Sequence, residues 1–371
     1  MNDPRPLPTP RADDADVASR VASTVRADVR SLSAYPVPKT DGCIQLHANE
    51  NPYPLPAPVR RAVAAAVARV PVHRYPDGAG DVVKAALAAA LPLPEGAGLV
   101  LGNGSDELIQ LLTTVVARPG ASVLAPEPTF VMYRIYAKQA GIPYVAVPLR
   151  PDFTVDEDAM LAAIARERPA LVWLASPNNP TGYRMPVASI ERILAAAPGV
   201  VVVDEAYADF GDHSLLPRVL EFANLVLLRT LSKVGLAGVR LGYAVAHPAW
   251  IAELDKVRSP YNVNALTQAV VPVVLASAGL LAEQVAAIRA ERSRLAEALA
   301  ARAGVTVFPS EANFLLVRVP DADAWAAHLR ARRILVKNLN GSHRALEQCL
   351  RITVGTPEEN GALLAALGSL P

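Results

Sequence analysis

The stretch Val200-Val-Val-Val-Asp-Glu-Ala-Tyr207 decides the fold class of this chain. Four β-branched residues in a row, without polar alternation, predict a strand that is buried on both faces. Similar short apolar runs, separated by longer helical patterns, occur at residues 99–101, 122–125, 171–174 and 225–228. Buried strands that alternate with helices predict right-handed βαβ units, and therefore an α/β fold with a mainly parallel sheet.

Small, polar or aromatic residues follow each of these five runs. They are Gly102-Asn-Gly-Ser-Asp106, Pro126-Glu-Pro-Thr-Phe130, Ala175-Ser-Pro-Asn-Asn-Pro-Thr-Gly182, Asp204-Glu-Ala-Tyr207 and Arg229-Thr-Leu-Ser-Lys233. In an open α/β sheet, ligands bind outside the carboxyl ends of the strands. The sequence therefore predicts one ligand crevice that all five segments border.

The C-terminal third has a different pattern. A long helical pattern runs from Ala265 to Gly304, with a break near Gly279. Two further apolar runs, 313–317 and 350–354, predict strands of a smaller C-terminal α/β domain. A chain of 371 residues exceeds the size at which a single core stops growing, which also favours one large and one small domain.

Composition excludes several classes of function. The formal net charge of +1 argues against a general nucleic-acid or membrane-surface binder. We expect no membrane span, because no apolar run is long enough, and no signal peptide, because the N-terminus lacks an apolar segment. Cys43 and Cys349 are the only cysteines, and the histidines lack metal-ligand spacing. We therefore expect a cytoplasmic protein without a metal site.

Two charged residues carry the functional hypothesis. Lys233 follows a buried strand, a position that suits a Schiff-base lysine, although a surface-loop lysine is the simpler interpretation of this residue alone. Asp204 ends an apolar strand and needs a cationic or donor partner. A protonated pyridinium nitrogen is such a partner in enzymes that use pyridoxal phosphate (PLP). A metal ion is the alternative, but Glu205 points to the other face and no histidine lies nearby.

Two turns have both a structural and a functional interpretation. Gly104-Ser105-Asp106 precedes a helical pattern, and free N–H groups at a helix N-terminus bind anions. The alternative is a simple cap by Ser105 or Asp106, and both interpretations can hold together. Asn179 lies in a tight turn, and its functional interpretation is a donor to the phenolic oxygen of PLP.

The order of these motifs resembles that of the fold-type I, class II aminotransferases. Finer segments are similar to the histidinol-phosphate aminotransferase family: Asn49-Glu-Asn-Pro52, Arg74-Tyr-Pro76, Ser176–Gly182, Thr230–Lys233 and Leu350-Arg-Ile-Thr-Val-Gly355. The resemblance spans about residues 30 to 365. It implies a large domain with a mainly parallel seven-stranded sheet between helices. The domain limits that we predict are a disordered arm over 1–30, a segment that packs with the small domain over 31–57, a PLP-binding large domain over 58–275 and a small domain over 276–371.

The resemblance implies cofactor-binding roles for named residues. Lys233 forms the Schiff base and later moves the proton, and Asp204 pairs with the pyridine nitrogen. Asn179 and Tyr207 hold the phenolic oxygen, and Phe130 stacks on the ring. The residues implied to surround the cofactor phosphate are Ser105, Asp106, Ser232 and Arg240. The spacing from Lys233 to Arg240 is one residue shorter than the family usually has, which predicts a tighter turn.

The resemblance also implies the substrates and the assembly. Histidinol phosphate and 2-oxoglutarate would give imidazole-acetol phosphate and glutamate, reversibly. Arg351 would bind the substrate carboxylate, and Lys337 stands where the family often has an arginine for the substrate phosphate. Three more residues would line the substrate pocket: Tyr35, Asn49 and Tyr261. Tyr75 would reach the cofactor phosphate of the partner subunit, which implies a homodimer with shared active sites.

Three other functions stay open at this point. An aromatic amino-acid aminotransferase would share most of the motifs, and so would a threonine-phosphate decarboxylase. A non-catalytic PLP-binding regulator belongs to a different class. Such regulators normally carry an N-terminal DNA-binding domain, whereas only about 30 residues precede the matched region and they hold no helix-turn-helix.

Overall fold

The computed structural model describes residues 13–33 and 40–369, which fall into two units, Met1–Lys39 and Thr40–Pro371. In the first unit, helix α1 (Asp14–Thr24) is capped by Asp13, whose side chain accepts a hydrogen bond from the backbone N–H of Ala15. Helix α2 (Ala27–Arg30) follows it. The first twelve residues of the predicted arm and Tyr35 lie outside the described residues.

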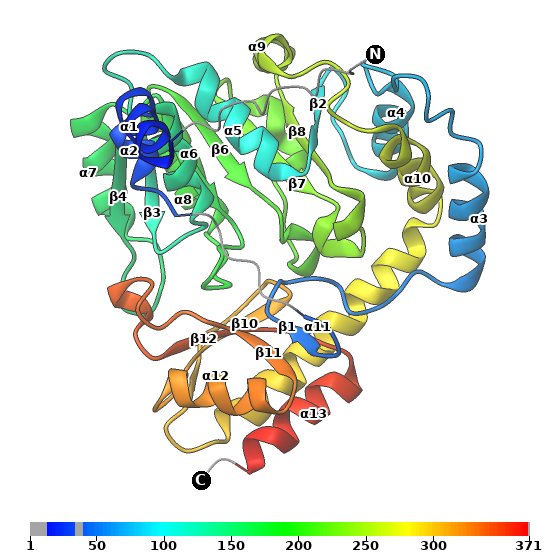
Figure 1. The fold of residues 1–371 in the computed structure, drawn as a ribbon, viewed down its shortest axis with the longest axis vertical. Helices are drawn as coiled ribbons and strands as arrows, with labels where there is room; N and C mark the ends of the chain where they lie inside the picture. The colour runs from blue at the N-terminus through cyan, green and yellow to red at the C-terminus, as the bar shows by residue number, and fades with distance from the viewer. Residues whose placement is uncertain (1–12, 34–39, 370–371) are drawn as a thin grey trace, which may run out of the picture. The chain divides into compact units, whose positions relative to one another are not determined.

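The second unit contains a seven-stranded sheet (Figure 1). Its strands, in spatial order, are β2 (Gly98–Asn103), β8 (Leu241–Ala246), β7 (Leu225–Thr230), β6 (Val200–Asp204), β5 (Leu171–Ala175), β3 (Val123–Glu127) and β4 (Tyr144–Pro148). Neighbouring strands from β7 to β4 are parallel, and β8 is antiparallel to both β2 and β7. The mainly parallel seven-stranded sheet is confirmed.

The sequence patterns missed two of these strands. β4 is a half-exposed edge strand that ends in a proline, so it lacks a continuous buried run. β8 follows the Lys233 segment without an intervening α-helix, so the alternation of strands and helices does not reveal it. The antiparallel direction of β8 has a consequence for the site. Its first residue, Leu241, pairs with the last residue of β2, Asn103, so β8 begins at the edge where its neighbours end.

Helices cover both faces of the large sheet, because successive strand residues point to opposite sides. In β6, Val201 and Val203 face one apolar core, while Val200 and Val202 face another. The first core receives α3 (Ala57–Val67), α4 (Asp81–Ala90), α7 (Glu157–Glu167), α8 (Val187–Ala196) and α10 (Ala265–Leu275). The second receives α5 (Ser105–Val116), α6 (Met132–Ala140) and α9 (Pro248–Val257). The sheet therefore lies between two helical layers, as expected.

A smaller five-stranded sheet forms the C-terminal part of this unit (Figure 1). Its strands, in spatial order, are β1 (Ile44–Leu46), β11 (Ile334–Asn338), β12 (Cys349–Thr353), β10 (Phe314–Arg318) and β9 (Thr306–Val307). Its apolar core is shared with α11 (Ala278–Ala300), α12 (Ala322–Ala331) and α13 (Pro357–Gly368). β1 pairs in parallel with β11, so a segment near residue 45 belongs to this sheet. The domain limits stated above remain predictions.

The remaining features are the division of the long helical pattern and five short 3-10 helices among the described residues. The long helical pattern after Ala265 is divided into α10 and α11, and the break falls at Ala276–Ser277, close to the predicted position. The 3-10 helices are η1 (Ala208–Phe210), η2 (Leu216–Glu221), η3 (Ser232–Val234), η4 (Ala237–Val239) and η5 (Arg344–Leu346). Among the described residues, no single helix meets the length and hydropathy of a membrane span, and only α10 taken with residues 279–300 passes that test as a bent pair.

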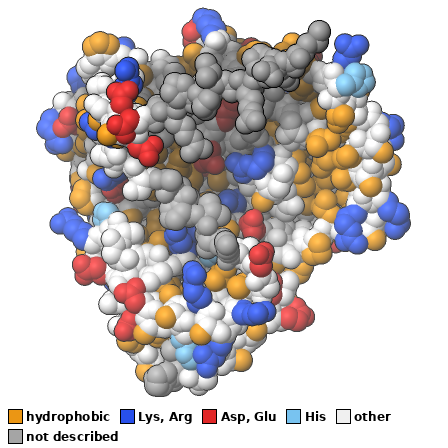
Figure 2. All heavy atoms as spheres, in the orientation of Figure 1, with side chains coloured by type: hydrophobic (Ala, Val, Ile, Leu, Met, Phe, Trp, Pro, Cys, Tyr) orange, Lys and Arg blue, Asp and Glu red, His pale blue; other side chains and the backbone are white. Residues whose placement is uncertain are grey.

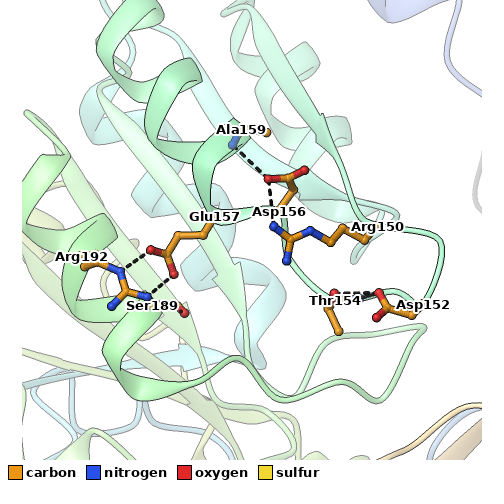
Figure 3. Close-up of polar contacts among 8 residues, drawn as sticks. All are labelled: Arg150, Asp152, Thr154, Asp156, Glu157, Ala159, Ser189 and Arg192. Carbon is orange, nitrogen blue, oxygen red and sulfur yellow. Dashed lines mark hydrogen bonds and ion pairs between the residues drawn. The ribbon is translucent and has the colours of Figure 1, made fainter.

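Local side-chain contacts fix where α7 begins (Figure 3). Asp156 accepts a hydrogen bond from the backbone N–H of Ala159 at 3.2 Å, the geometry of a helix N-cap. Arg150 pairs with the same carboxylate at 3.4 Å. The next residue, Glu157, pairs with Arg192 of α8. These contacts join the start of α7 to the middle of α8 on one face of the large sheet.

Candidate active site

One end of the predicted crevice is built to receive an anion. Gly104 has φ of 81° and directly precedes the 12-residue helix α5. Arg240 lies just before β8, and a Cβ atom on Gly104 would collide with its guanidinium group. A Cβ atom on Gly242 would collide with the backbone nitrogen of Ser105. Free N–H groups of a helix start and a guanidinium group therefore meet in a tightly packed cradle.

The segment between Lys233 and Arg240 is as tight as its length predicts. It forms two successive 3-10 helices, η3 and η4, and Arg240 ends the second with φ of 58°. The guanidinium group of Arg240 lies 3.4 Å from the carboxylate of Asp106 in the first turn of α5. Ser232 is buried, and its hydroxyl is bonded to Thr230 at 3.0 Å. Arg240 and the start of α5 are thus brought together, as the motifs indicated.

The carboxylate of Asp204 lies at the centre of the edge, 6% exposed. Its Oδ2 accepts a hydrogen bond from the hydroxyl of Tyr133 at 2.6 Å, and its Oδ1 accepts one from the backbone N–H of Ala206 at 3.0 Å. Burial raises the pKa of Asp204 to about 6, although both hydrogen bonds and the nearby Lys233 act in the opposite direction. Among the described residues, no cation lies within ion-pair distance of this carboxylate.

The chemistry of these donors fits PLP at both ends. A buried carboxylate is stable when a cationic group lies against it, and a protonated ring nitrogen is of that type. The cradle of Gly104 and Arg240 fits the phosphate. The expectation for Glu205 is consistent with its contacts, since its carboxylate binds Ser214, the backbone N–H of Leu215 and, at 3.7 Å, Arg229.

Lys233 and Tyr207 approach each other between these two ends. The amine Nζ of Lys233 lies 5.7 Å from the centroid of the Tyr207 ring. The hydroxyl of Tyr207 accepts a hydrogen bond from Nδ2 of Asn49 at 2.9 Å. Asn49 is held by Thr353, whose hydroxyl accepts from its backbone N–H, and by Asn313, which donates to its carbonyl oxygen. Because Tyr207 accepts from Asn49, its own hydroxyl proton remains available to donate.

Arg351 connects the smaller sheet to the Asn179 turn. Its guanidinium group donates to Oδ1 of Asn179 at 2.5 Å and to the carbonyl oxygen of His47 at 2.8 Å. Since Oδ1 of Asn179 accepts from Arg351, its Nδ2 is turned to the other side as a donor. Lys337 lies directly opposite Arg351 in the β11–β12 pair, so both side chains stand on the same face. Burial lowers the pKa of His47, opposed by Glu50 and assisted by Arg351 and Lys337, which favours a neutral imidazole.

Tyr75 and Tyr261 lie apart from the residues just described. The Tyr75 side chain is 80% exposed and stacks on Tyr261, with ring centroids 4.6 Å apart and an interplanar angle of 12°. A surface cavity of about 340 Å³ lies beside Tyr75, between residues of α3 and α10. Hydrophobic side chains gather over the part of the surface where Figure 1 places α4 and α10, as Figure 2 shows. The contacts within this chain therefore leave Tyr75 facing outward.

The sequence patterns did not identify Tyr133. It lies in the first turn of α6, three residues after Phe130, whose ring meets it edge-on at 5.7 Å. Its ring stacks on Trp173 of β5 at 4.5 Å. The only signal was its position just after the segment that follows β3. Such a signal does not distinguish a residue that contacts the site from one in the helical core.

Comparisons with known proteins agree with this geometry. Residues 41–367 match the aminotransferase class I and II family. Histidinol-phosphate aminotransferase of Chromobacterium violaceum is 54% identical over 94% of this chain and 98% of its own length. Histidinol-phosphate aminotransferase 1 of Ralstonia nicotianae is 52% identical, over 93% of this chain and 94% of its own length.

A solved structure of a related protein has the same fold. The histidinol-phosphate aminotransferase of Sinorhizobium meliloti, in complex with pyridoxal-5′-phosphate, superposes with a TM-score of 0.83. It is 27% identical, and the match covers 93% of this chain and 96% of that one. The chain therefore belongs to the class I and II aminotransferases and, within them, to the histidinol-phosphate aminotransferase family.

Proposed function

We propose that this protein is a PLP-dependent histidinol-phosphate transaminase of histidine biosynthesis. It converts histidinol phosphate and 2-oxoglutarate into imidazole-acetol phosphate and glutamate, reversibly. The observation that carries the proposal is the buried carboxylate of Asp204, which lies near the amine of Lys233 at the same sheet edge as the Gly104–Arg240 cradle. The names and high identity of the relatives support the choice of substrate.

Lys233 is the proposed catalytic residue. When bound, PLP supplies an aldehyde carbon that takes up an amino group and a ring that accepts the electron pair left by proton removal. Nζ of Lys233 would hold the cofactor covalently. Its free amine would take the α-proton of the substrate and deliver it to the C4′ carbon of the cofactor, a general-base task. Nζ of Lys233 lies 5.7 Å from the centre of the Tyr207 ring, where the substrate amine would enter only by displacing it.

The polar groups at the ring have complementary tasks. Asp204 pairs with the protonated ring nitrogen and so keeps the ring able to accept electrons. Tyr207 and Asn179 donate to the phenolic oxygen. Tyr207 accepts a hydrogen bond from Asn49, and Asn179 accepts one from Arg351, and these bonds orient the two donors. Phe130 covers one face of the ring. Its lack of a hydroxyl leaves stacking unaffected.

The phosphate of the cofactor is bound at the start of α5. The backbone N–H groups there and the guanidinium group of Arg240 supply hydrogen bonds and positive charge. Ser105 and Ser232 add hydroxyl donors. Asp106 acts as an acceptor that orients Arg240, since the two side chains lie 3.4 Å apart.

The substrate is bound from the smaller sheet. Arg351 binds the substrate carboxylate, for which its forked guanidinium group is well suited. Lys337, on the same face, binds the phosphate of histidinol phosphate as a point charge. Asn49 donates to the hydroxyl of Tyr207 and lines the substrate pocket beside it.

The homodimer and the cytoplasmic location belong to the same proposal. The outward-facing Tyr75 reaches the cofactor phosphate of a second copy, so each site is completed by its partner. Tyr261 is stacked on Tyr75 and thereby lies close to the same shared site. Both cysteines, Cys43 and Cys349, are free thiols, which suits a reducing compartment.

Titration of the purified protein with single substrates tests the proposal. Histidinol phosphate should bleach the visible band of the bound cofactor at concentrations at which phenylalanine and threonine phosphate have no effect. The product should be imidazole-acetol phosphate, without release of carbon dioxide. Equal bleaching by phenylalanine would overturn the proposed substrate. Release of carbon dioxide from threonine phosphate would overturn the proposed reaction. A protein that takes up no PLP would overturn the whole proposal.

A further inference from the structure

Tyr133 connects two parts of the site that the motifs treat separately. Its hydroxyl donates to Oδ2 of Asp204 at 2.6 Å, a short distance typical of a donor on a charged oxygen. Its ring also receives the edge of Phe130 at 5.7 Å. Tyr133 therefore contacts both the residue proposed to pair with the ring nitrogen and the residue proposed to cover the ring.

The surroundings hold Tyr133 in one position. The side chain is fully buried, and its ring is nearly parallel to that of Trp173, with an interplanar angle of 2° and centroids 4.5 Å apart. Burial and the neighbouring Asp204 raise the pKa of Tyr133 well above its ordinary value, so the hydroxyl stays protonated and remains a donor. A rigid, permanently protonated donor can act on Asp204 only through its hydrogen bond.

Each oxygen of Asp204 already accepts one hydrogen bond, from Tyr133 or from the backbone N–H of Ala206. A carboxylate oxygen accepts about two, so each retains one acceptor position for a ligand. The charged groups that face this carboxylate most closely are Lys233 and Asp106. Loss of the Tyr133 donor would therefore make Asp204 more basic, because a hydrogen bond to the ionised form favours that form.

We propose that Tyr133 is a positioning residue that keeps Asp204 ionised, so that the proton shared with the cofactor stays on the ring nitrogen. This inference rests on the proposed function. Without the hydroxyl of Tyr133, the proton moves toward the carboxylate, and the ring becomes a weaker electron acceptor. Tyr133 would thus determine how strongly the cofactor ring accepts electrons, although it does not contact the ring nitrogen.

The test uses full-length Tyr133→Phe, which removes the hydroxyl and keeps the ring that stacks on Trp173. Both proteins are loaded with PLP labelled with ¹⁵N in the ring, and the ¹⁵N chemical shift is recorded at pH 7.5. The wild type should show a protonated ring nitrogen. In Tyr133→Phe the ratio of proton on nitrogen to proton on Asp204 should fall about tenfold, equivalent to about one pKa unit.

A matched control separates this effect from the loss of a buried hydroxyl in general. Tyr243 is 2% exposed, belongs to the core on the opposite face of the sheet, and is hydrogen-bonded to Arg229. Tyr243→Phe should leave the ¹⁵N shift unchanged. In an Asp204→Asn background, adding Tyr133→Phe should cost no further kcat, because the residue acts through Asp204.

The outcomes are distinguishable. An unchanged ¹⁵N shift in Tyr133→Phe, or an equal further loss of kcat in the Asp204→Asn background, would overturn the inference and leave the proposed function standing. A wild type that binds no labelled PLP would overturn both. If only Tyr133→Phe loses PLP, its apoprotein is examined. In the apoprotein the pKa of Asp204 should be about one unit higher than in the wild-type apoprotein, and an unchanged pKa would contradict the inference.

Discussion

Replacement of Asp204 by asparagine should stabilise the protein when no cofactor is bound. Burial raises the pKa of Asp204 from 3.8 to about 6, so the folded protein binds the proton of this group more tightly than the unfolded chain does. The shift of about two units corresponds to roughly 3 kcal/mol against the folded state once both forms are ionised. Asparagine removes the charge and keeps nearly the same shape.

The direction of this pKa shift makes the effect of the substitution on stability depend on pH. Because the folded-state pKa is raised, ionised Asp204 destabilises the folded protein. This free-energy cost is absent below about pH 4, grows as the pH rises from 3.8 through 6, and is constant above that. The amide nitrogen of asparagine cannot accept one of the two hydrogen bonds, a loss of about 1 kcal/mol. The Asp204→Asn apoprotein should therefore exceed the wild type by about 1–2 kcal/mol in unfolding free energy at pH 7.5, and should not exceed it at pH 4.

The assay is urea unfolding of both apoproteins across this pH range. Asp212→Asn serves as the control, because Arg289 lowers the pKa of this exposed carboxylate, so its removal should bring no gain. An Asp204→Asn apoprotein that is less stable than the wild type at pH 7.5, or a gain that does not vary with pH, would refute the reasoning. The same variant should bind PLP poorly, so stability and function oppose each other at this residue.

Three further results are expected. Gly104→Ala should lose retained PLP in gel filtration, because its φ of 81° strains any other residue and a methyl group would displace the guanidinium group of Arg240; normal retention would contradict the cradle. Arg351→Lys should raise KM for 2-oxoglutarate at least about tenfold, because lysine cannot donate to Asn179 and a carboxylate in the same forked way. Asp156→Ala should lower the unfolding free energy by about 1 kcal/mol through loss of the α7 cap, with kcat unchanged; a change in kcat would contradict a purely structural role.

The carboxyl ends of the strands were the most predictable part of the site. The Val200–Val203 run and its four counterparts predicted parallel strands, and the residues after each run gather at one edge of the sheet. That conclusion depends only on strand burial and on the direction of parallel strands. β4 and β8 could not be predicted in the same way, because one is an exposed edge strand and the other breaks the alternation with helices.

Contacts between residues far apart in the chain needed the structure. The bond between Tyr133 and Asp204 joins a helix start to a strand end, and nothing in either local sequence indicates it. The same holds for Arg351, which meets Asn179 across 172 positions of the chain. The exposed Tyr75 shows another limit, since the chain by itself does not supply the group that this residue is proposed to bind.

Covalent attachment of PLP to Lys233 is the central claim, and reduction with borohydride tests it most directly. Reduction of the PLP-loaded protein, followed by digestion and peptide mass spectrometry, should place the pyridoxyl group on Nζ of Lys233, and Lys233→Ala should carry no label. A label on another lysine, or no stable label on a wild-type protein that has taken up PLP, would contradict the account.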